Sequence, residues 1–272
     1  MPELPEVETT RRGLAARVLG QRIAQVIVRN RALRWPVSAG LEAAVAGMRI
    51  DSIGRRAKYL LFYCEGRGRI LVHLGMSGRL WIVPRAEPLA RHDHVDIVLS
   101  GGLSIRLRDP RRFGAVLWLP GDAPEHSLLT AIGPEPLTPA FDATYLFRAT
   151  RKRSAAIKLV LMDSGVVAGV GNIYANEALF AAGINPRTQA RRVGLTRLAR
   201  LVGEVKAILE RAIDAGGSSL RDYVDSDGQA GNFQSSFRVY DRAGEPCLEC
   251  ATPVRTIRQS NRSTFYCVRC QT

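Results

Sequence analysis

Two pairs of cysteines near the C-terminus constrain the fold of this chain most strongly. Cys247 and Cys250 form one Cys-x-x-Cys knuckle, Cys267 and Cys270 form a second, and 16 residues separate the two. This spacing is typical of a structural zinc site with four thiolate ligands. In a chain without secretory features, such knuckles bind metal more often than they form disulfides. We therefore predict one structural Zn²⁺ and no organic cofactor.

The segment between the knuckles has the composition of a hairpin that contacts nucleic acid. Arg255, Arg258 and Arg262 lie there, followed by a Thr-Phe-Tyr run at 264–266. Arginine makes charge-assisted hydrogen bonds to phosphate, and such contacts provide affinity for a nucleic-acid backbone of any sequence. We therefore expect this hairpin to hold its arginine side chains against a nucleic-acid backbone.

The charge of the whole chain also indicates a polyanionic partner. Its 272 residues include 39 Lys and Arg against 25 Asp and Glu, a formal net charge of +14. Attachment to a ribosome or to a membrane surface is the alternative on charge alone. No apolar run reaches the length of a membrane span, and the N-terminus lacks a signal-peptide pattern, so we expect a cytoplasmic protein.

The first residues could support nucleophilic and acid catalysis. Removal of Met1 would leave Pro2 with a free amine whose pKa is roughly 8, so that part of it is unprotonated near neutral pH. Glu3 follows at once, and a carboxylic acid there could protonate a sugar oxygen during glycosyl transfer. Proline and acidic residues also favour the first turn of a helix, so an ordinary helix start is the alternative.

Hydrophobic periodicity predicts an α+β chain. Residues 5–19 have the apolar spacing of a helix, and Gly20 stands where that helix should end. From residue 21 to about 119 the period changes to two, which indicates an antiparallel sandwich or barrel in which Cys64 is a buried thiol. Helical periodicity then extends from about 139 to 215. Strands are predicted at 23–28, 59–63, 70–72, 80–83, 95–98, 104–107 and 115–118.

Several turns between the predicted strands carry residues suited to DNA. Met76 lies in a glycine-flanked turn, and Phe113 follows Arg111 and Arg112 in another. An exposed apolar side chain beside arginines resembles the wedges that enter base stacks. A buried Phe in an ordinary hairpin is the alternative for Phe113. A zinc motif or a simple polar loop is the alternative for the segment around His92.

The helical half contains one further candidate for phosphate binding. Asn172 follows a Gly-Val-Gly stretch, where glycine allows close backbone approach and a helix start can bind phosphate. A nucleotide-binding turn fits poorly because no strand precedes it. We therefore expect Asn172 to contact a DNA phosphate, with Arg153 adding positive charge upstream unless that run is simply a solvated face.

Together these motifs resemble the formamidopyrimidine-DNA glycosylase family. The resemblance spans the whole chain in order, through the Pro-Glu-Leu-Pro-Glu-Val-Glu opening, the turn 109–114, the stretch 169–174 and the cysteine knuckles. It implies an N-terminal antiparallel β-sandwich flanked by helices, a helix–two-turns–helix domain and a zinc-finger β-hairpin, with DNA crossing the cleft between them. The implied limits are 1–132 for the catalytic domain, 133–225 for the helical domain, 226–237 for the end of a lesion loop and linker, and 238–272 for the zinc finger.

The resemblance implies a bifunctional base-excision repair enzyme. Such an enzyme acts as a monomer on double-stranded DNA that contains oxidised purines or abasic sites. It excises 8-oxoguanine and formamidopyrimidines and then cuts the strand by β,δ-elimination. It is expected in the bacterial cytoplasm, associated with the nucleoid and not with a membrane.

The family's residue roles carry over by position. Pro2 resembles the Schiff-base nucleophile, Glu3 the acid that opens the sugar, Lys58 the proton donor for β-elimination and Arg262 the residue for δ-elimination. The implied DNA contacts are His92, Arg111, Arg153 (often Lys in the family) and Asn172. Met76, Arg111 and Phe113 resemble the side chains that fill the gap left by the everted base. The segment 218–236 resembles the loop that closes over the flipped lesion.

Two alternatives remain at the level of sequence. An endonuclease VIII-like glycosylase shares the fold and the chemistry but acts on oxidised pyrimidines, and its opening resembles Pro-Glu-Gly-Pro. A non-catalytic zinc-finger DNA-binding protein is the second alternative. The Pro-Glu-Leu-Pro opening argues against the first, and the amine of Pro2 beside Glu3 argues against the second.

Overall fold

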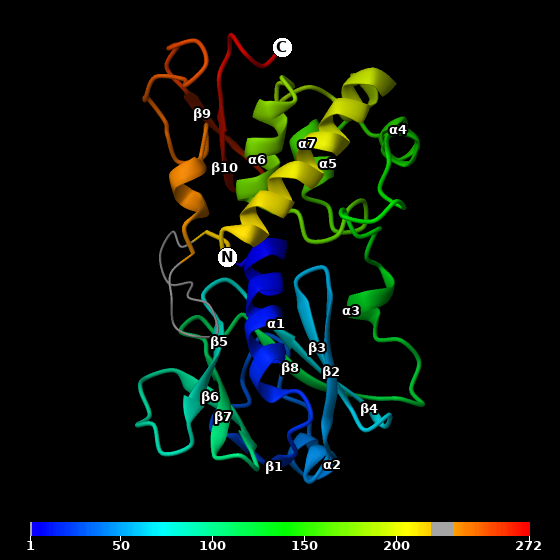
Figure 1. Cartoon of the computed structure of the whole chain (residues 1–272). Helices are drawn as coiled ribbons and strands as arrows, with labels where there is room; N and C mark the ends of the chain where they lie inside the picture. The colour runs from blue at the N-terminus through cyan, green and yellow to red at the C-terminus, as the bar shows by residue number, and fades with distance from the viewer. Residues whose placement is uncertain (1, 219–230) are drawn as a thin grey trace. The chain divides into compact units, whose positions relative to one another are not determined.

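The computed structural model describes residues 2–218 and 231–272, and the chain forms two compact units (Figure 1). The described residues of 1–130 and 215–232 form the first unit, and those of 131–214 and 233–272 form the second. Most of the predicted lesion loop, 219–230, lies outside the described residues. No described helix is long and apolar enough to cross a membrane.

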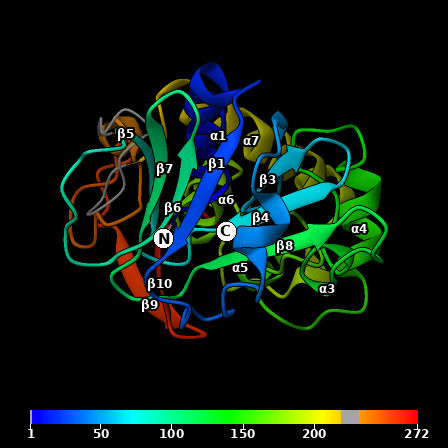
Figure 2. The same ribbon diagram turned by 90° about the horizontal axis from the view of Figure 1, so that it is seen from below.

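Two four-stranded antiparallel sheets make up the first unit (Figure 2). One sheet has the order β1 (Ile23–Val28), β6 (Asp93–Leu99), β7 (Leu103–Arg108) and β5 (Arg79–Pro84). The other has the order β2 (Ile50–Arg56), β3 (Tyr59–Cys64), β4 (Gly68–His73) and β8 (Ala115–Pro120). The predicted sandwich is confirmed. Strand β2 was missed because Asp51, Ser52 and Gly54 interrupt its apolar alternation.

Helix α1 (Leu4–Val18) packs against the sandwich and contacts β2 and β5, the edge strands of the two sheets. Leu4, Leu14 and Val18 are fully buried, as the predicted apolar face requires, and Gly20 ends the helix region with φ +79°. Two short helices, α2 (Leu41–Val45) and α3 (Ser127–Thr130), complete this unit. Cys64 is fully buried, so the predicted buried thiol is confirmed, and burial raises the pKa of this thiol to about 12.

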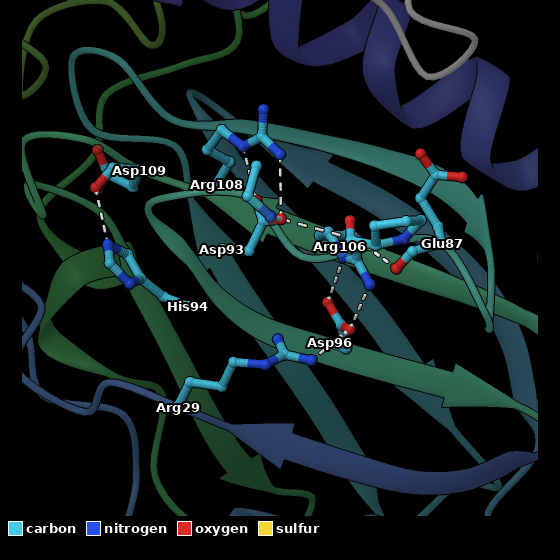
Figure 3. Close-up of polar contacts among 10 residues, drawn as sticks. Arg29, Glu87, Asp93, His94, Asp96, Arg106, Arg108 and Asp109 are labelled. Atoms are coloured by element: carbon cyan, nitrogen blue, oxygen red, sulfur yellow. Dashed lines mark hydrogen bonds and ion pairs between the residues drawn. The ribbon is translucent and has the colours of Figure 1, made fainter.

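A buried ionic network covers the face of one sheet that points away from the core (Figure 3). Arg106 is 2% exposed and donates two hydrogen bonds to Asp96, at 2.9 and 3.0 Å. Its remaining nitrogen donates to the carbonyl oxygens of Glu87 and Pro88, at 3.2 and 3.1 Å. A single buried guanidinium therefore holds the β5–β6 loop, which carries His92, onto strand β7.

Neighbouring arginines complete the network. Arg108 donates to both oxygens of Asp93, at 2.6 and 3.0 Å, and Arg29 donates to Asp96 at 2.8 Å. Burial alone would raise the pKa of Asp93, but the hydrogen bonds from Arg108 bring it below its ordinary value. Asp93 and Asp96 therefore stay ionised in the fold, and each has a second cation besides Arg106.

The second unit consists of helices and a β-hairpin. The longest described helix, α7 (Leu195–Asp214), is amphipathic, with Leu198, Leu201 and Leu209 fully buried, and it packs against α6 (Asn172–Ala181) and α4 (Ala143–Thr150). The helical pattern predicted around 195–213 is thus confirmed. The elements are α4 (Ala143–Thr150), α5 (Ile157–Leu161), α6 (Asn172–Ala181), α7 (Leu195–Asp214), the 3₁₀ turns η1 (Ala190–Arg192) and η2 (Phe233–Ser236), and the hairpin β9 (Arg255–Gln259) and β10 (Arg262–Tyr266).

The hairpin and the cysteine knuckles pack against helix α6. Asn176 accepts the backbone N–H of Phe265 at 2.8 Å, and Phe180 shares an apolar cluster with Phe265 and Val254. Glu177 is 3% exposed and accepts three consecutive backbone N–H groups, those of residues 238–240, at 2.8 to 3.0 Å. Two buried polar side chains of α6, Asn176 and Glu177, therefore anchor the C-terminal segment to this helix.

The ionic network leads to a stability prediction. Arg106→Met should lower the free energy of unfolding by about 3 kcal/mol, the low end for a broken buried pair, because Arg108 and Arg29 still partner the two carboxylates. Urea unfolding at pH 7 measures the loss. Arg49→Met is the matched control, because Arg49 makes an exposed pair with Asp51 and should change the unfolding free energy little. Equal losses in the two variants would contradict the prediction.

Candidate functional site

The start of helix α1 is held by two buried carboxylates. Glu3 and Glu6 form a capping box in which Glu6 accepts the backbone N–H of Glu3 at 2.7 Å. The other oxygen of Glu6 accepts the N–H and the hydroxyl of Ser218, at 2.8 and 3.0 Å. Glu3 is 2% and Glu6 is 1% exposed, and Pro2 is buried beside them. The backbone next to the Pro2 nitrogen is therefore fixed from two sides, and both readings of the opening, helix start and acid–amine pair, fit this arrangement.

Lys58 lies in the tight turn between β2 and β3, and this turn is tied to helix α1. Arg55 donates to the Glu8 carboxylate at 3.1 Å and to the carbonyl oxygen of Ala57 at 2.9 Å. The side chains of Arg55 and Glu8 are each 12% exposed. The structure thus places the Lys58 turn against the helix that begins just after Glu3. It also shows that Arg55 pairs with a largely buried carboxylate.

His73, which the sequence prediction did not single out, shares the environment of Lys58. It pairs with Tyr59 across β3 and β4, with ring centroids 4.9 Å apart, and its Nδ1 accepts the N–H of Gly75 at 3.1 Å. Burial, assisted by the charges of Lys58 and Arg34, lowers the pKa of His73 to about 4. The ring is therefore neutral at pH 7 and carries its proton on Nε2. Its position at the end of a strand, opening a glycine-flanked turn, was the signal in the sequence.

The two turns with wedge candidates come together in the first unit. Phe113 is 37% exposed, so the alternative of a buried Phe is wrong. The Arg111 guanidinium lies 4.6 Å from the centre of the Phe113 ring, and Met76 on the neighbouring turn is half-buried. His92 is half-buried with φ +75°. The four cysteines are the only group of possible metal ligands among the described residues, so the alternative of zinc at His92 is not supported there.

In the second unit, the carbonyl oxygen of Ser263 brings Asn172 and Arg262 near one another. Asn172, the first residue of α6, donates to this oxygen at 3.1 Å, and Lys158 donates to it at 2.9 Å. Lys158 is fully buried and donates also to the Thr264 hydroxyl at 2.7 Å. Arg262 immediately precedes Ser263 at the start of β10, so these bonds hold it beside the helix start. The sequence analysis did not single out Lys158.

Arg153, the remaining predicted DNA contact, lies in the turn after α4. Its guanidinium pairs with Asp163 at 2.7 Å, and the two side chains are 43% and 40% exposed. An exposed pair of this kind contributes little to stability and separates easily. Arg153 can therefore exchange this carboxylate for a phosphate at small cost.

The four cysteine sulfurs form a cluster suited to one metal ion. All four lie within 4.8 Å of one another, with Cys247 and Cys270 at 3.9 Å and Cys250 and Cys267 at 3.5 Å. A tetrahedron with Zn–S bonds of about 2.3 Å requires sulfur–sulfur distances of about 3.8 Å. The donor type, number and spacing therefore fit a structural Zn²⁺, and no fifth side chain is needed.

Comparison with known proteins places the chain in a family. Residues 1–116 match the formamidopyrimidine-DNA glycosylase N-terminal domain, and residues 132–224 match the H2TH domain of the same enzymes. Residues 244–272 match the zinc finger found in FPG and IleRS. A formamidopyrimidine-DNA glycosylase of Cupriavidus pinatubonensis is 56% identical, with both chains covered completely. The chain belongs to the formamidopyrimidine-DNA glycosylase family.

Solved structures of this family have the same fold along the whole chain. A Lactococcus lactis formamidopyrimidine-DNA glycosylase variant in complex with Fapy-dG-containing DNA is 32% identical, with a TM-score of 0.92 and complete coverage of both chains. The complex of the L. lactis enzyme with abasic-site DNA is 32% identical, with a TM-score of 0.91 and the same coverage. The predicted α+β architecture is confirmed, as is the family resemblance.

The environment of His73 leads to a prediction about pH. Its pKa of about 4 is below the ordinary 6.5, so the unfolded chain takes up the proton first. The stability that neutral His73 contributes is therefore complete above pH 6.5 and is lost as the pH falls toward 4. Nitrogen NMR should show a neutral ring at pH 5.5, and His73→Asn should lose less stability than the wild type across this range. A titration midpoint near 6.5 in the folded protein would refute the assignment.

The cysteine cluster leads to a prediction about metal removal. Cys250→Ala should lose the zinc ion and the order of the β9–β10 hairpin, because metal binding supplies much of the folding free energy of such short modules. Zinc content and amide hydrogen exchange measure the two effects, and the amides of the sandwich should stay protected. Cys64→Ala is the matched control, since this thiol lies outside the cluster and should keep one zinc per chain. A Cys250 variant with normal zinc content would exclude the four-thiolate site.

Proposed function

We propose that this glycosylase removes oxidised purines, 8-oxoguanine and formamidopyrimidines, from duplex DNA and cleaves the abasic strand by β,δ-elimination through an iminium on Pro2. The observation that carries the proposal is the opening of helix α1, where the capping box of Glu3 and Glu6 holds two buried carboxylates in the residues that follow Pro2. The L. lactis relatives bound to Fapy-dG DNA and to abasic-site DNA support the substrate class.

The first step uses Pro2 and Glu3. Removal of Met1 converts the Pro2 nitrogen from an amide into a secondary amine, which can act as a nucleophile. The amine attacks C1′ of the damaged nucleotide, the bond from C1′ to the base breaks, and the base leaves with its electron pair and a proton. Glu3 protonates the sugar ring oxygen, the ring opens, and an iminium forms between C1′ and the Pro2 nitrogen.

The second step cleaves the strand. The iminium makes the C2′ proton acidic, and loss of this proton expels the 3′ phosphate. Lys58 is assigned the proton transfer in this β-elimination, and neutral His73 lies in the same environment. Arg262 is assigned to δ-elimination, in which its permanent charge stabilises the departing 5′ phosphate. Hydrolysis of the iminium then releases Pro2. Zinc stabilises the hairpin that carries Arg262 and takes no part in bond breaking.

The remaining site residues are assigned to DNA. His92, Arg111, Arg153 and Asn172 bind the backbone, mostly through contacts that do not depend on sequence. Met76, Arg111 and Phe113 fill the gap left by the everted base. We assign the predicted limits 1–132, 133–225, 226–237 and 238–272 to the catalytic, helical, linker and zinc-finger regions. Because the substrate is chromosomal DNA, we place the enzyme as a monomer with the bacterial nucleoid in the cytoplasm.

Oxidised pyrimidines are the alternative substrate class. The Pro-Glu-Leu-Pro opening differs from the Pro-Glu-Gly-Pro of the endonuclease VIII-like enzymes, and this difference favours purines. Excision of 8-oxoguanine and of thymine glycol from otherwise identical duplexes separates the two classes. Faster release of thymine glycol would reverse the assignment.

Borohydride trapping tests the mechanism. Incubation with an 8-oxoguanine duplex and borohydride should reduce the iminium and yield one covalent adduct on the N-terminal peptide, because Pro2 is the amine with the lowest ordinary pKa. Mass spectrometry of the digested adduct gives the position. Glu3→Gln should form the adduct with abasic DNA but not with 8-oxoguanine DNA, since abasic DNA already offers an aldehyde.

Glu42→Gln, a surface carboxylate that pairs with Arg31, is the matched control and should react like the wild type. One extra residue ahead of Pro2 should abolish both adducts, because it turns the nitrogen into a tertiary amide. An adduct on Lys58 or on the buried Lys158 would overturn the mechanism.

A further inference from the structure

We propose that Asp109 is a positioning residue that joins the Met76 turn and the Phe113 turn into one preformed wedge. The inference rests on the proposed function, in which Met76 and Phe113 enter the base stack together. The sequence treats these side chains as members of two separate turns, 73–79 and 109–114. The contacts of Asp109 show that the two turns are built as a single body.

The Asp109 carboxylate bridges the two turns directly. It is fully buried, and one oxygen accepts the Ser77 hydroxyl at 3.1 Å while the other accepts the backbone N–H of Gly114 at 2.8 Å. The Ser77 oxygen in turn accepts the backbone N–H of Arg111 at 3.3 Å. The residue after Met76 and the residue after Phe113 are therefore held by the same side chain.

The two backbones also touch without any side chain between them. A Cβ added at Gly75 would lie 2.5 Å from the carbonyl carbon of Phe113, and Gly75 has φ +62°. A Cβ added at Gly114 would lie 2.6 Å from the carbonyl oxygen of His73. Glycine is needed at both positions because the turns approach to backbone contact. Asp109 is the only acidic residue in the two turns, 73–79 and 109–114. Its carboxylate lies between the turns and contacts both of them.

A third segment is attached to the same residue (Figure 3). The Asp109 N–H donates to the carbonyl oxygen of His92 at 3.1 Å, and His94 Nε2–H donates to the Asp109 carbonyl oxygen at 3.0 Å. The backbone of Asp109 therefore also holds the segment that carries His92, the proposed phosphate contact, beside the two turns. Both carboxylate oxygens are taken up by neutral donors, which leaves the guanidinium of Arg111 stacked on Phe113.

This arrangement matters because a wedge that is already ordered loses less conformational entropy when it displaces a base. If the turns were independent, DNA binding would have to order each of them, and that entropy would reduce the affinity. A frame held by buried hydrogen bonds is already ordered in the free enzyme. Loss of the frame should therefore weaken insertion, even though Asp109 itself is buried and touches no nucleotide.

The test uses the full-length zinc-loaded enzyme and a duplex that pairs a stable tetrahydrofuran abasic analogue with 2-aminopurine. Wild-type enzyme should raise the 2-aminopurine fluorescence as the wedge unstacks it. Asp109→Ala should lose most of this rise, and its kcat/KM for 8-oxoguanine should fall about 10- to 100-fold, the range expected when positioned groups shift by about 1 Å. Ser77→Ala should give a smaller loss of the same kind.

Asp109→Asn is the conservative variant and should restore the signal. Its amide oxygen can accept the Gly114 N–H, and its NH₂ group can donate to the Ser77 oxygen, so both bridges persist without charge. Cys64→Ala, in the same sandwich but outside both turns, controls for a general loss of stability and should leave fluorescence and rate nearly unchanged. An Asn variant as impaired as the Ala variant would overturn the proposal.

A double-mutant cycle separates a frame from a general structural role. If Asp109 acts through the wedge, Asp109→Ala should cost much less in a Met76→Ala background than in the wild type. Additive effects would refute the inference. Failure of the wild-type enzyme to excise 8-oxoguanine and to cleave abasic DNA would refute the proposed function instead, while the fluorescence of the tetrahydrofuran duplex would still report on the wedge.

Discussion

A carboxylate taken out of water must be supplied with hydrogen-bond donors or cations, since an unpaired buried charge costs several kcal/mol. This protein buries Glu6, Asp96, Asp109 and Glu177, each 3% exposed or less. Each accepts at least one hydrogen bond from a residue 32 or more positions away in the sequence. These bonds tie distant segments together around the candidate site.

The four carboxylates accept hydrogen bonds from different kinds of donor, and the kind of donor determines which part of the chain each one positions. Asp96 accepts guanidinium groups, which span the outer face of a sheet and reach the β5–β6 loop. Glu6 and Glu177 accept mainly backbone N–H groups, and Asp109 accepts one backbone N–H and one hydroxyl. A backbone donor fixes the course of the chain itself, so these three set where a helix start, a pair of turns and the C-terminal segment lie. The guanidinium of Arg111 is thereby left stacked on the Phe113 ring.

The cysteine cluster and two polar side chains of the helices together determine where Arg262 lies. The four thiolates close the C-terminal segment on itself, which a module of this size cannot achieve with its few apolar residues. Lys158 and Asn172 then hold the carbonyl of Ser263, next to Arg262, at the start of α6. Zinc therefore provides local order, and a buried lysine provides the position. Because Lys158 uses its ammonium for two hydrogen bonds, it is poorly suited to attack a sugar.

Local pattern in the sequence determined much of this protein. The spacing of the cysteines indicated the zinc site, the period of two indicated the sandwich, and the order of motifs along the chain indicated the family. Strand β2 was not predicted because polar residues interrupt its apolar alternation. The bonds that position the site could not be read in the same way: Glu6 and Ser218 are 212 residues apart, Lys158 and Ser263 are 105, and Asp109 and Ser77 are 32. A hydrogen bond depends on the distance and angle between two atoms, and for residues so far apart only the packing of sheets and helices decides these. The sequence by itself therefore indicated the zinc ligands and predicted catalytic roles for Pro2 and Glu3, whereas the tertiary structure decided that His73 is neutral beside Lys58 and that Met76 and Phe113 share one frame.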